Sequence, residues 1–303
     1  MPSLKEIKGR IGSVKSTLKI TSAMKLVASA KLRKAQQAIE GMRPYERKLQ
    51  EMMARLMAGR EGALSGAFAR TGSRSDAEES APSLSAEKER IAIVAFASNS
   101  SLCGAFNANV VRLTLEALKE YADDDVTVYS VGRKMADSMR KVGKPSPADF
   151  QKLADKPAYA PAAELAEKLM EDFREGRLDR VELIYNHFVS SGKQVPVREI
   201  LLPMATVISS GAEGGVEKSD TDYIVEPSAS ALLEELLPKS LKLKFFTALL
   251  DSNASEHAAR TVAMQTATDN GEDLLQELTL QYNKSRQQKI TSEILDLAGG
   301  SQE

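Results

Sequence analysis

Residues that could carry out covalent chemistry are few in this 303-residue sequence. It contains one cysteine, Cys103, and two histidines, His187 and His257. Their spacing to one another and to acidic residues is not typical of a metal site, nor of a nucleophile paired with a base. A single cysteine also excludes an internal disulfide. The sequence therefore favours a buried structural thiol at Cys103 and a packed or surface role for His187.

Phosphate-binding glycine motifs are not found at the expected places. Gly59, Gly62 and Gly66 do not precede a Lys-Ser/Thr pair and do not follow a strand. Only Gly104 follows the apolar run 91–97, and the residue pair 132–133 (Gly-Arg) stands where a ribose-binding acidic residue would end the second strand. We therefore expect a scaffold that is not an enzyme and needs no cofactor or metal.

Positive charge is concentrated near the N-terminus. Residues 1–60 hold fourteen Lys/Arg and four Asp/Glu, although the whole chain has a net charge of −1. No acidic residue lies between Lys8 and Ile39, whereas a helix built only for solubility interleaves both signs. A solvated face is the simpler interpretation of such a charge run. The absence of acidic neighbours favours an anionic partner for a cluster made of Lys25, Lys31, Arg33 and Lys34.

These cations belong to a predicted helix over residues 3–57, which would be roughly 80 Å long and needs a partner along its length. Its apolar residues follow the three-and-four spacing of a coiled coil at Leu4, Ile7, Ile11, Val14 and Leu18. After Leu18 we expect the pattern to shift to Ile20, Met24 and Val27. Residues 239–298 lack proline and form the only other stretch that could pair with this helix.

The middle of the chain predicts a small α/β domain. Strands are expected at 91–97, 126–131, 181–189 and 195–202, and helices at 108–121, 133–142 and 162–174. This order indicates a largely parallel sheet whose last two strands pair antiparallel. The predicted organisation is an N-terminal coiled-coil helix (1–58), a linker or mobile loop (59–90), an α/β domain (91–226) and a C-terminal coiled-coil helix (227–303). No run of eighteen apolar residues and no signal peptide is found, so we expect no membrane span.

The C-terminal end carries a second group of candidate residues. Arg286 and Gln287 lie in the polar segment NKSRQQK, and Ile290, Ile294 and Leu297 follow at helical spacing. From periodicity alone, the polar pair is an ordinary exposed turn of helix.

Several segments resemble the gamma subunit of the rotary, F-type ATP synthase. They are ITSAMKLVASAKLRKAQ (20–36), SLCGAFNANV (101–110), VGRK (131–134), EPS (226–228), ASEHAARTVAMQTATDN (254–270) and YNKSRQQKITSEILDLAGG (282–300). They occur in the family's order and cover nearly the whole chain. Two departures are Asn99-Ser100-Ser101, where the family usually has Asp-Arg-Gly, and Gly271, where Ala is common.

The resemblance implies an antiparallel coiled coil of the terminal helices and a Rossmann-like α/β domain. It implies a non-catalytic rotor of the central stalk that couples rotation of the membrane c-ring to the catalytic beta subunits. One copy would serve three alpha and three beta subunits and would also contact the epsilon subunit, on the cytoplasmic face of a bacterial plasma membrane. By position, Met24 and Lys25 resemble residues that face an acidic lever of the beta subunit, Arg286 and Gln287 a polar contact pair, and Ile290, Ile294 and Leu297 the tip in an apolar bearing.

Two other classes of function remain open from the residues alone. A basic coiled coil could bind nucleic acid or an anionic membrane, although this leaves the acidic remainder of the chain unexplained. An enzyme could bind a nucleotide on the α/β domain, but the phosphate motif is missing. The resemblance favours the rotor and no nucleic-acid partner.

Overall fold

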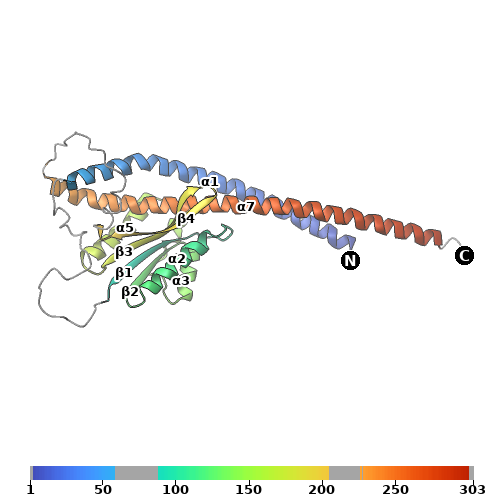
Figure 1. Cartoon of the computed structure of the whole chain (residues 1–303), viewed down its shortest axis with the longest axis horizontal. Coiled ribbons are helices and arrows are strands. Elements are labelled where there is room, and N and C mark those ends of the chain that lie inside the picture. The colour runs from blue at the N-terminus through green and yellow to red at the C-terminus, as the bar shows by residue number, and fades with distance from the viewer. Residues whose placement is uncertain (1–2, 59–87, 205–225, 227, 300–303) are drawn as a thin grey trace. The chain divides into compact units, whose positions relative to one another are not determined.

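The computed structural model describes residues 3–58, 88–204, 226 and 228–299. The chain divides into two compact units, one made of residues 1–30 with 260–303 and the other of residues 31–259. The two long helices α1 (Leu4–Ala58) and α7 (Ala229–Gly299) contribute to both units (Figure 1). The predicted domain boundaries at 58, 90 and 226 stay predictions.

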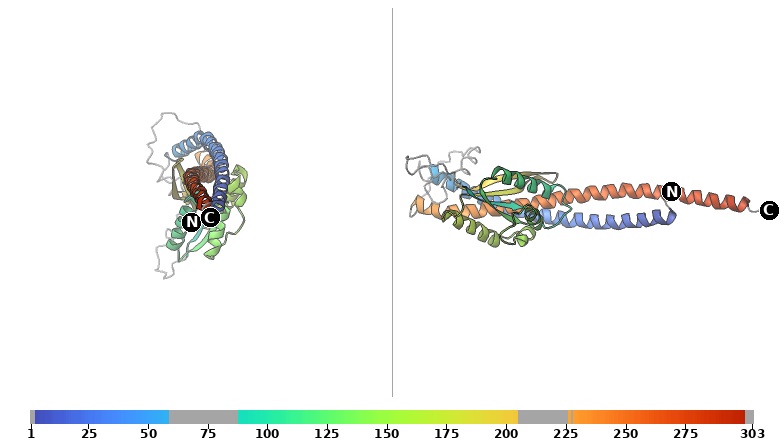
Figure 2. Two further views of the ribbon diagram at one scale, coloured as in Figure 1. Left: turned by 90° about the vertical axis from the view of Figure 1, so that its right-hand side faces the viewer. Right: turned by 90° about the horizontal axis from the view of Figure 1, so that it is seen from below.

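In the first unit α1 and α7 lie side by side and run antiparallel (Figure 2). Three successive contacts fix this direction, because the α7 partner falls in number as the α1 residue rises. A Cβ on Gly271 would lie 2.7 Å from Leu18 Cδ2, Thr268 Oγ1 donates to Thr21 Oγ1 at 3.0 Å, and Lys25 Nζ donates to Gln265 Oε1 at 2.8 Å. The predicted antiparallel pairing of the terminal helices is confirmed.

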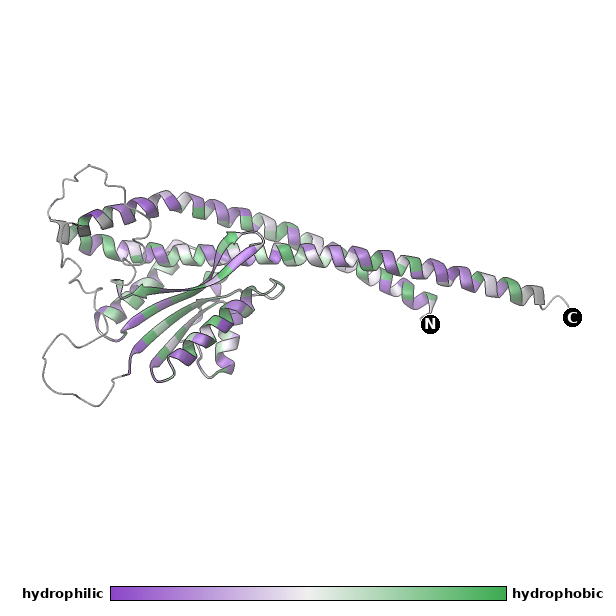
Figure 3. Ribbon diagram, viewed as in Figure 1, coloured by the Kyte–Doolittle hydropathy of each residue, from purple (hydrophilic) through white to green (hydrophobic). Residues whose placement is uncertain are grey.

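The line of residues along which α1 and α7 face each other is called the seam here. The predicted shift of this apolar pattern after Leu18 is wrong. Buried and half-buried residues on this part of α1 keep one seven-residue repeat through Leu4, Ile7, Ile11, Val14, Leu18, Thr21, Lys25 and Ala28. Ile20 and Val27 lie off this repeat and are exposed, and Met24 is half-buried beside it. Colouring by hydropathy shows apolar and polar residues interleaved along both helices (Figure 3). The seam continues through polar residues because Thr21 and Lys25 find hydrogen-bond partners on α7.

The second unit contains a four-stranded sheet in the order β2-β1-β3-β4. Its strands are β1 (Arg90–Phe96), β2 (Asp125–Val131), β3 (Arg180–Ser190) and β4 (Lys193–Leu202). β1 pairs parallel with β2 and β3, and β3 pairs antiparallel with β4, as the sequence predicts. Both edges are protected from further pairing: β4 carries Pro196, and the segment after α3 donates from Lys144 Nζ to the carbonyl of Val126.

Helices cover both faces of this sheet, because successive side chains of a strand point to opposite faces. Ile91, Ile93 and Ala95 pack with α2 (Phe106–Glu120) and α3 (Arg133–Lys141). Ala92, Val94 and Phe96 share a core with α4 (Gln151–Asp155), α5 (Tyr159–Arg174) and the 31–259 portions of α1 and α7. The sequence did not predict α4, which has only five residues.

The start of α7 follows the predicted capping pattern. Ser228 Oγ accepts a hydrogen bond from the N–H of Ala231 at 3.2 Å. Pro44 and Pro238 lie inside α1 and α7, and both helices continue past them.

Most of the predicted linker and the polar segment 208–222 lie outside the described residues. Among the helices that are described, none is long and apolar enough to cross a membrane.

Candidate functional site

The carboxyl end of β1, where parallel α/β sheets bind ligands, is filled by the chain itself. Asn99 Oδ1 accepts from the N–H of Arg133 at the start of α3 at 2.9 Å, and Asn99 Nδ2 donates to the carbonyl of Gln151 at 2.8 Å. Gly132 has φ of +103°, and a Cβ there would lie 2.1 Å from the carbonyl oxygen of Ala97, so this close approach requires glycine.

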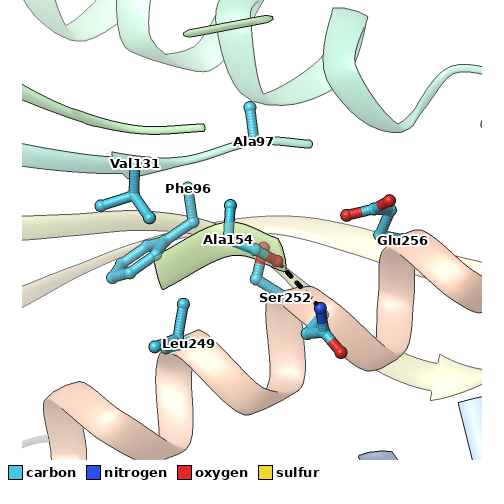
Figure 4. Close-up of a pocket in the computed structure, with 8 residues that line it drawn as sticks. Phe96, Ala97, Val131, Ala154, Leu249, Ser252 and Glu256 are labelled. Atoms are coloured by element: carbon cyan, nitrogen blue, oxygen red, sulfur yellow. Dashed lines mark hydrogen bonds between the residues drawn. The ribbon is translucent and has the colours of Figure 1, made fainter. Parts of the chain in front are cut away.

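Helices α4 and α7 close the remaining space at this end of the sheet (Figure 4). The cavity there measures about 10 Å³, room for about one water molecule. It is lined by Phe96, Ala97, Val131, Ala154, Leu249, Ser252, Asn253 and Glu256. A nucleotide does not fit at this place.

The candidate chemical side chains are built into the fold of the second unit. Cys103 is 1% exposed, packs with Phe106 and Ala259, and its Sγ accepts from Asn107 Nδ2 at 3.1 Å. Its prediction as a buried thiol is confirmed. His187 lies on β3 with a half-exposed side chain and bonds to Asp251 of α7. Within the described ranges, no group of three or more His, Cys, Asp or Glu side chains could hold a metal ion.

The cationic cluster predicted on α1 divides into two parts. Lys25 is half-buried in the seam of the first unit, where its ammonium group donates a hydrogen bond to Gln265. In the second unit Lys31, Arg33 and Lys34 are exposed. Lys31 Nζ lies 3.9 Å from Asp155 Oδ1, but both side chains are more than half exposed, so this ion pair contributes little. The charge of these three residues therefore remains accessible to a partner.

Large apolar residues are exposed on the first unit's portion of α1. The exposed fractions are 60% for Ile20, 68% for Leu26 and 59% for Val27. Sequence reasoning assigned Ile20 and Val27 to the seam and overlooked Leu26. Their position off the seven-residue repeat is the signal that identifies them as surface residues. Several large apolar side chains so close together on one exposed helix segment are typical of an interaction surface.

The C-terminal end of α7 forms the second exposed surface. The last residues in the seam are Leu278, which is buried, and Tyr282 and Ser285, which are half-buried. From Arg286 to Leu295 every residue is exposed, including Arg286 and Gln287 themselves. Exposed apolar residues in this stretch are Ile290 at 47%, Ile294 at 59% and Leu295, which the sequence analysis did not single out, at 65%. The side chain of Leu297 lies outside the described residues.

A family model described as "ATP synthase" matches residues 3–302. The "ATP synthase gamma chain" of Phocaeicola vulgatus is 52% identical over 305 residues, covering 99% of both chains. The protein of the same name from Bacteroides fragilis strain ATCC 25285 is 52% identical over 307 residues, also covering 99% of both chains.

A similar fold occurs in a cryo-EM structure of the Euglena gracilis mitochondrial ATP synthase (OSCP/F1/c-ring, rotational state 3). A chain of that assembly matches with a TM-score of 0.61 and 22% identity, covering 98% of this chain and 93% of that one.

Proposed function

Because this chain belongs to the ATP synthase gamma-chain family, we propose that it is the central-stalk rotor of an F-type ATP synthase. In this role it couples rotation of a proton-driven c-ring to the conformational cycle of the catalytic beta subunits. The observation that carries the proposal is the pair of exposed surfaces on the terminal helices. Paired helices that keep large apolar side chains in water gain stability when a surrounding protein covers them.

The α1 surface supplies the contact with the ring of three alpha and three beta subunits. Ile20, Leu26 and Val27 provide apolar area, and Met24 lies half-buried between them. In the second unit Lys31, Arg33 and Lys34 provide a positive surface for an acidic element of the beta subunit. Lys25 also belongs to this proposed contact by its position, and in the free chain its ammonium group donates a hydrogen bond to Gln265 of α7 at 2.8 Å.

The α7 surface supplies the contact near the end of the rotor. Arg286 and Gln287 are exposed and can hydrogen-bond with a ring subunit. Exposed Ile290 and Ile294, together with Leu297 by its position in the sequence, belong to the apolar tip that turns in a bearing. A smooth apolar bearing suits rotation, because apolar contacts have no directional hydrogen bonds to break at each step.

The remaining partners follow from the same role. The α/β domain contacts the epsilon subunit and the c-ring, and this attachment holds the chain at the cytoplasmic face of a bacterial plasma membrane. Bond chemistry takes place on the beta subunits, so the chain itself is non-catalytic. The space at the carboxyl end of β1, which the chain itself fills, supports the proposal that nucleotides bind on the beta subunits and not at this end of the sheet.

Co-expression with alpha and beta subunits, followed by native mass spectrometry, tests the proposal. We expect one copy of this chain per three alpha and three beta subunits, with ATP hydrolysis appearing on assembly. A chain that stays alone, or binds in several copies, would refute the rotor assignment. Binding to DNA or anionic vesicles with steep salt dependence would then support the basic coiled-coil alternative.

Substitutions test the α7 contact residues in the assembled complex. Arg286→Ala and Gln287→Ala should lower ATP hydrolysis and synthesis while the free chain keeps its stability, because both side chains are exposed. Matched controls are Arg112→Ala on α2 and Gln50→Ala on α1, which are also exposed and lie in the second unit. Equal turnover of all four variants would exclude a torque role for Arg286 and Gln287.

A further inference from the structure

The β3–β4 hairpin extends beyond the parallel part of the sheet. β3 pairs with β1 only as far as Ile184, opposite Ala95. From Tyr185 to Ser190 it pairs with β4 alone, back to Lys193. An isolated two-stranded ribbon is at best marginally stable in water. This arm, residues 185–197, therefore needs support from another element.

At the base of the arm, Tyr185 and Val197 pack in the main core of the unit, and Asn186 Nδ2 donates to the carbonyl of Phe106 on α2 at 3.0 Å. Further support comes from one face of α7 in the same unit. Asp251 Oδ1 accepts a hydrogen bond from the N–H of Phe188 at 2.8 Å, and Asp251 Oδ2 bonds to His187 Nδ1. One turn further along, Ser255 Oγ donates to the carbonyl of Asn186 at 2.8 Å. Three consecutive residues of the arm are thus bound to two positions on α7 that are four apart.

An apolar contact completes this attachment. Phe188 packs against a cluster formed by Leu32 and Ala35 of α1 with Ala254 and Ala258 of α7. The arm therefore lies across both helices at the place where small residues let them approach. Asp251 is 9% exposed, and its carboxylate is the only acidic group that bonds to arm residues 186–188 among the hydrogen bonds of the described chain.

We propose that the β3–β4 arm is a strap across the helix pair, and that Asp251 is the positioning residue that holds it closed. Its detachment and reattachment change how firmly α1 and α7 are held together at residues 32–35 and 254–258. The strap is a property of the second unit alone and does not depend on the rotor function.

Charged and titratable groups surround Asp251 from every element packed near it. Those that interact with Asp251 are Arg43 and Glu46 on α1 and Tyr185 and His187 on β3; Glu199 on β4 and Lys244 on α7 interact in turn with Glu46. Burial raises the pKa of Asp251 above the ordinary aspartate value, and the hydrogen bonds from Phe188 and His187 oppose this increase in part. Burial likewise raises the pKa of Glu46.

The sign of the pH dependence follows from the Asp251 shift. With the strap open, the carboxylate is in water and titrates near its ordinary pKa of about 3.9. The closed strap has the higher pKa and so binds a proton more tightly than the open one. This contribution to closure is fully present below the ordinary pKa and is lost as the pH rises through the pKa of the closed form. Acidification through the pKa of the closed form toward the ordinary aspartate pKa therefore favours the closed strap.

Hydrogen exchange of the Phe188 amide in the free, full chain measures closure directly. In Asp251→Ala the amide loses its acceptor, and we expect its protection factor to fall roughly tenfold or more. Asp251→Asn keeps an acceptor oxygen without the charge, so the strap should stay closed and lose its pH dependence. The matched control is Asp155→Ala, an exposed aspartate on α4 of the same unit. The amide of buried Val94 in β1 reports whether each variant remains folded.

A measurement without substitutions keeps the proposal testable if Asp251→Ala fails to fold. Relative to Val94, protection of the Phe188 amide in the unmodified chain should be higher near the ordinary aspartate pKa, at about pH 4, than at neutral pH, after correction for intrinsic exchange rates. Unchanged protection in a folded Asp251→Ala, or protection that rises with pH, would overturn the proposal. Asp251→Asn as open as Asp251→Ala would also overturn it, because closure would then require the charge.

Discussion

Replacing Glu182 with glutamine tests the buried ionic cluster between α2, β3 and β4. Glu182 is 1% exposed on the sheet face covered by α2. Its Oε1 accepts from Tyr121 Oη at 2.6 Å, and its Oε2 accepts from Arg198 Nε at 2.7 Å. Glutamine has nearly the same shape but only one acceptor oxygen, and its NH₂ group would face donors. The substitution therefore removes a charge and at least one charge-assisted hydrogen bond.

The loss can be bounded from the surroundings of Arg198. Breaking a buried ion pair by removing one partner costs about 3–5 kcal/mol. The Arg198 side chain is 23% exposed and keeps Glu120 as a second partner at 2.5 Å, so the cost falls toward the lower end. We expect Glu182→Gln to lower the free energy of unfolding of the second unit by about 3 kcal/mol. Glu120→Gln should have little effect, because Glu120 is exposed and water screens its interaction.

Hydrogen exchange of the buried Leu183 amide on β3 reports this change within the second unit. A loss of about 3 kcal/mol should speed its exchange by about 100-fold when exchange follows global opening. Glu182→Leu combined with Arg198→Leu should recover most of the loss, since an apolar pair carries no desolvated charge. A change below about fivefold in Glu182→Gln would refute the reasoning and show that Arg198 relaxes into water.

Three further predictions concern single side chains. Lys25→Met should leave the thermal stability of the free chain equal or higher, because an apolar residue suits a seam position better than a lysine held by Gln265; a clear loss would show that this bond dominates. Val27→Asp should leave the free chain's stability unchanged but prevent assembly with alpha and beta subunits, seen by native mass spectrometry, whereas Gln50→Asp should assemble normally. Cys103 should react with a thiol reagent only on unfolding, and reaction of the folded chain at the rate of free glutathione would contradict its burial.

The sheet was predictable from the sequence because its signals are local. The run from Ile91 to Ala97 is continuously apolar, as expected for a strand buried on both faces, and β1 covers Arg90–Phe96. The cap at Ser228 was likewise readable from its type and its proline neighbour. Helix α4 was missed because five residues give too little periodicity to recognise.

The seam and the strap show where sequence reasoning fails. Following apolar residues led to Ile20 and Val27, whereas the seam passes through Thr21 and Lys25. Polar residues are tolerated there only because a partner on another helix satisfies them, and that partner is 247 positions away for Thr21. His187 likewise bonds to a partner on another element, Asp251, which is 64 positions away in the sequence. Such pairings depend on the folded arrangement, and no local pattern encodes them.

The position of α7 in the core has a consequence for how the chain is made. Phe245 is fully buried and stacks edge-on against Phe96 of β1, with ring centroids 5.5 Å apart. Leu241, Leu243, Leu249 and Leu250 complete the same core. A ribosome makes β1 about 150 residues before these side chains, so this core lacks its α7 side chains until α7 has been made, although α1, α4 and α5 already contribute to it. Completion of this core therefore requires segments from both ends of the chain, and the domain reaches its final packing only after residues 241–250 have been made.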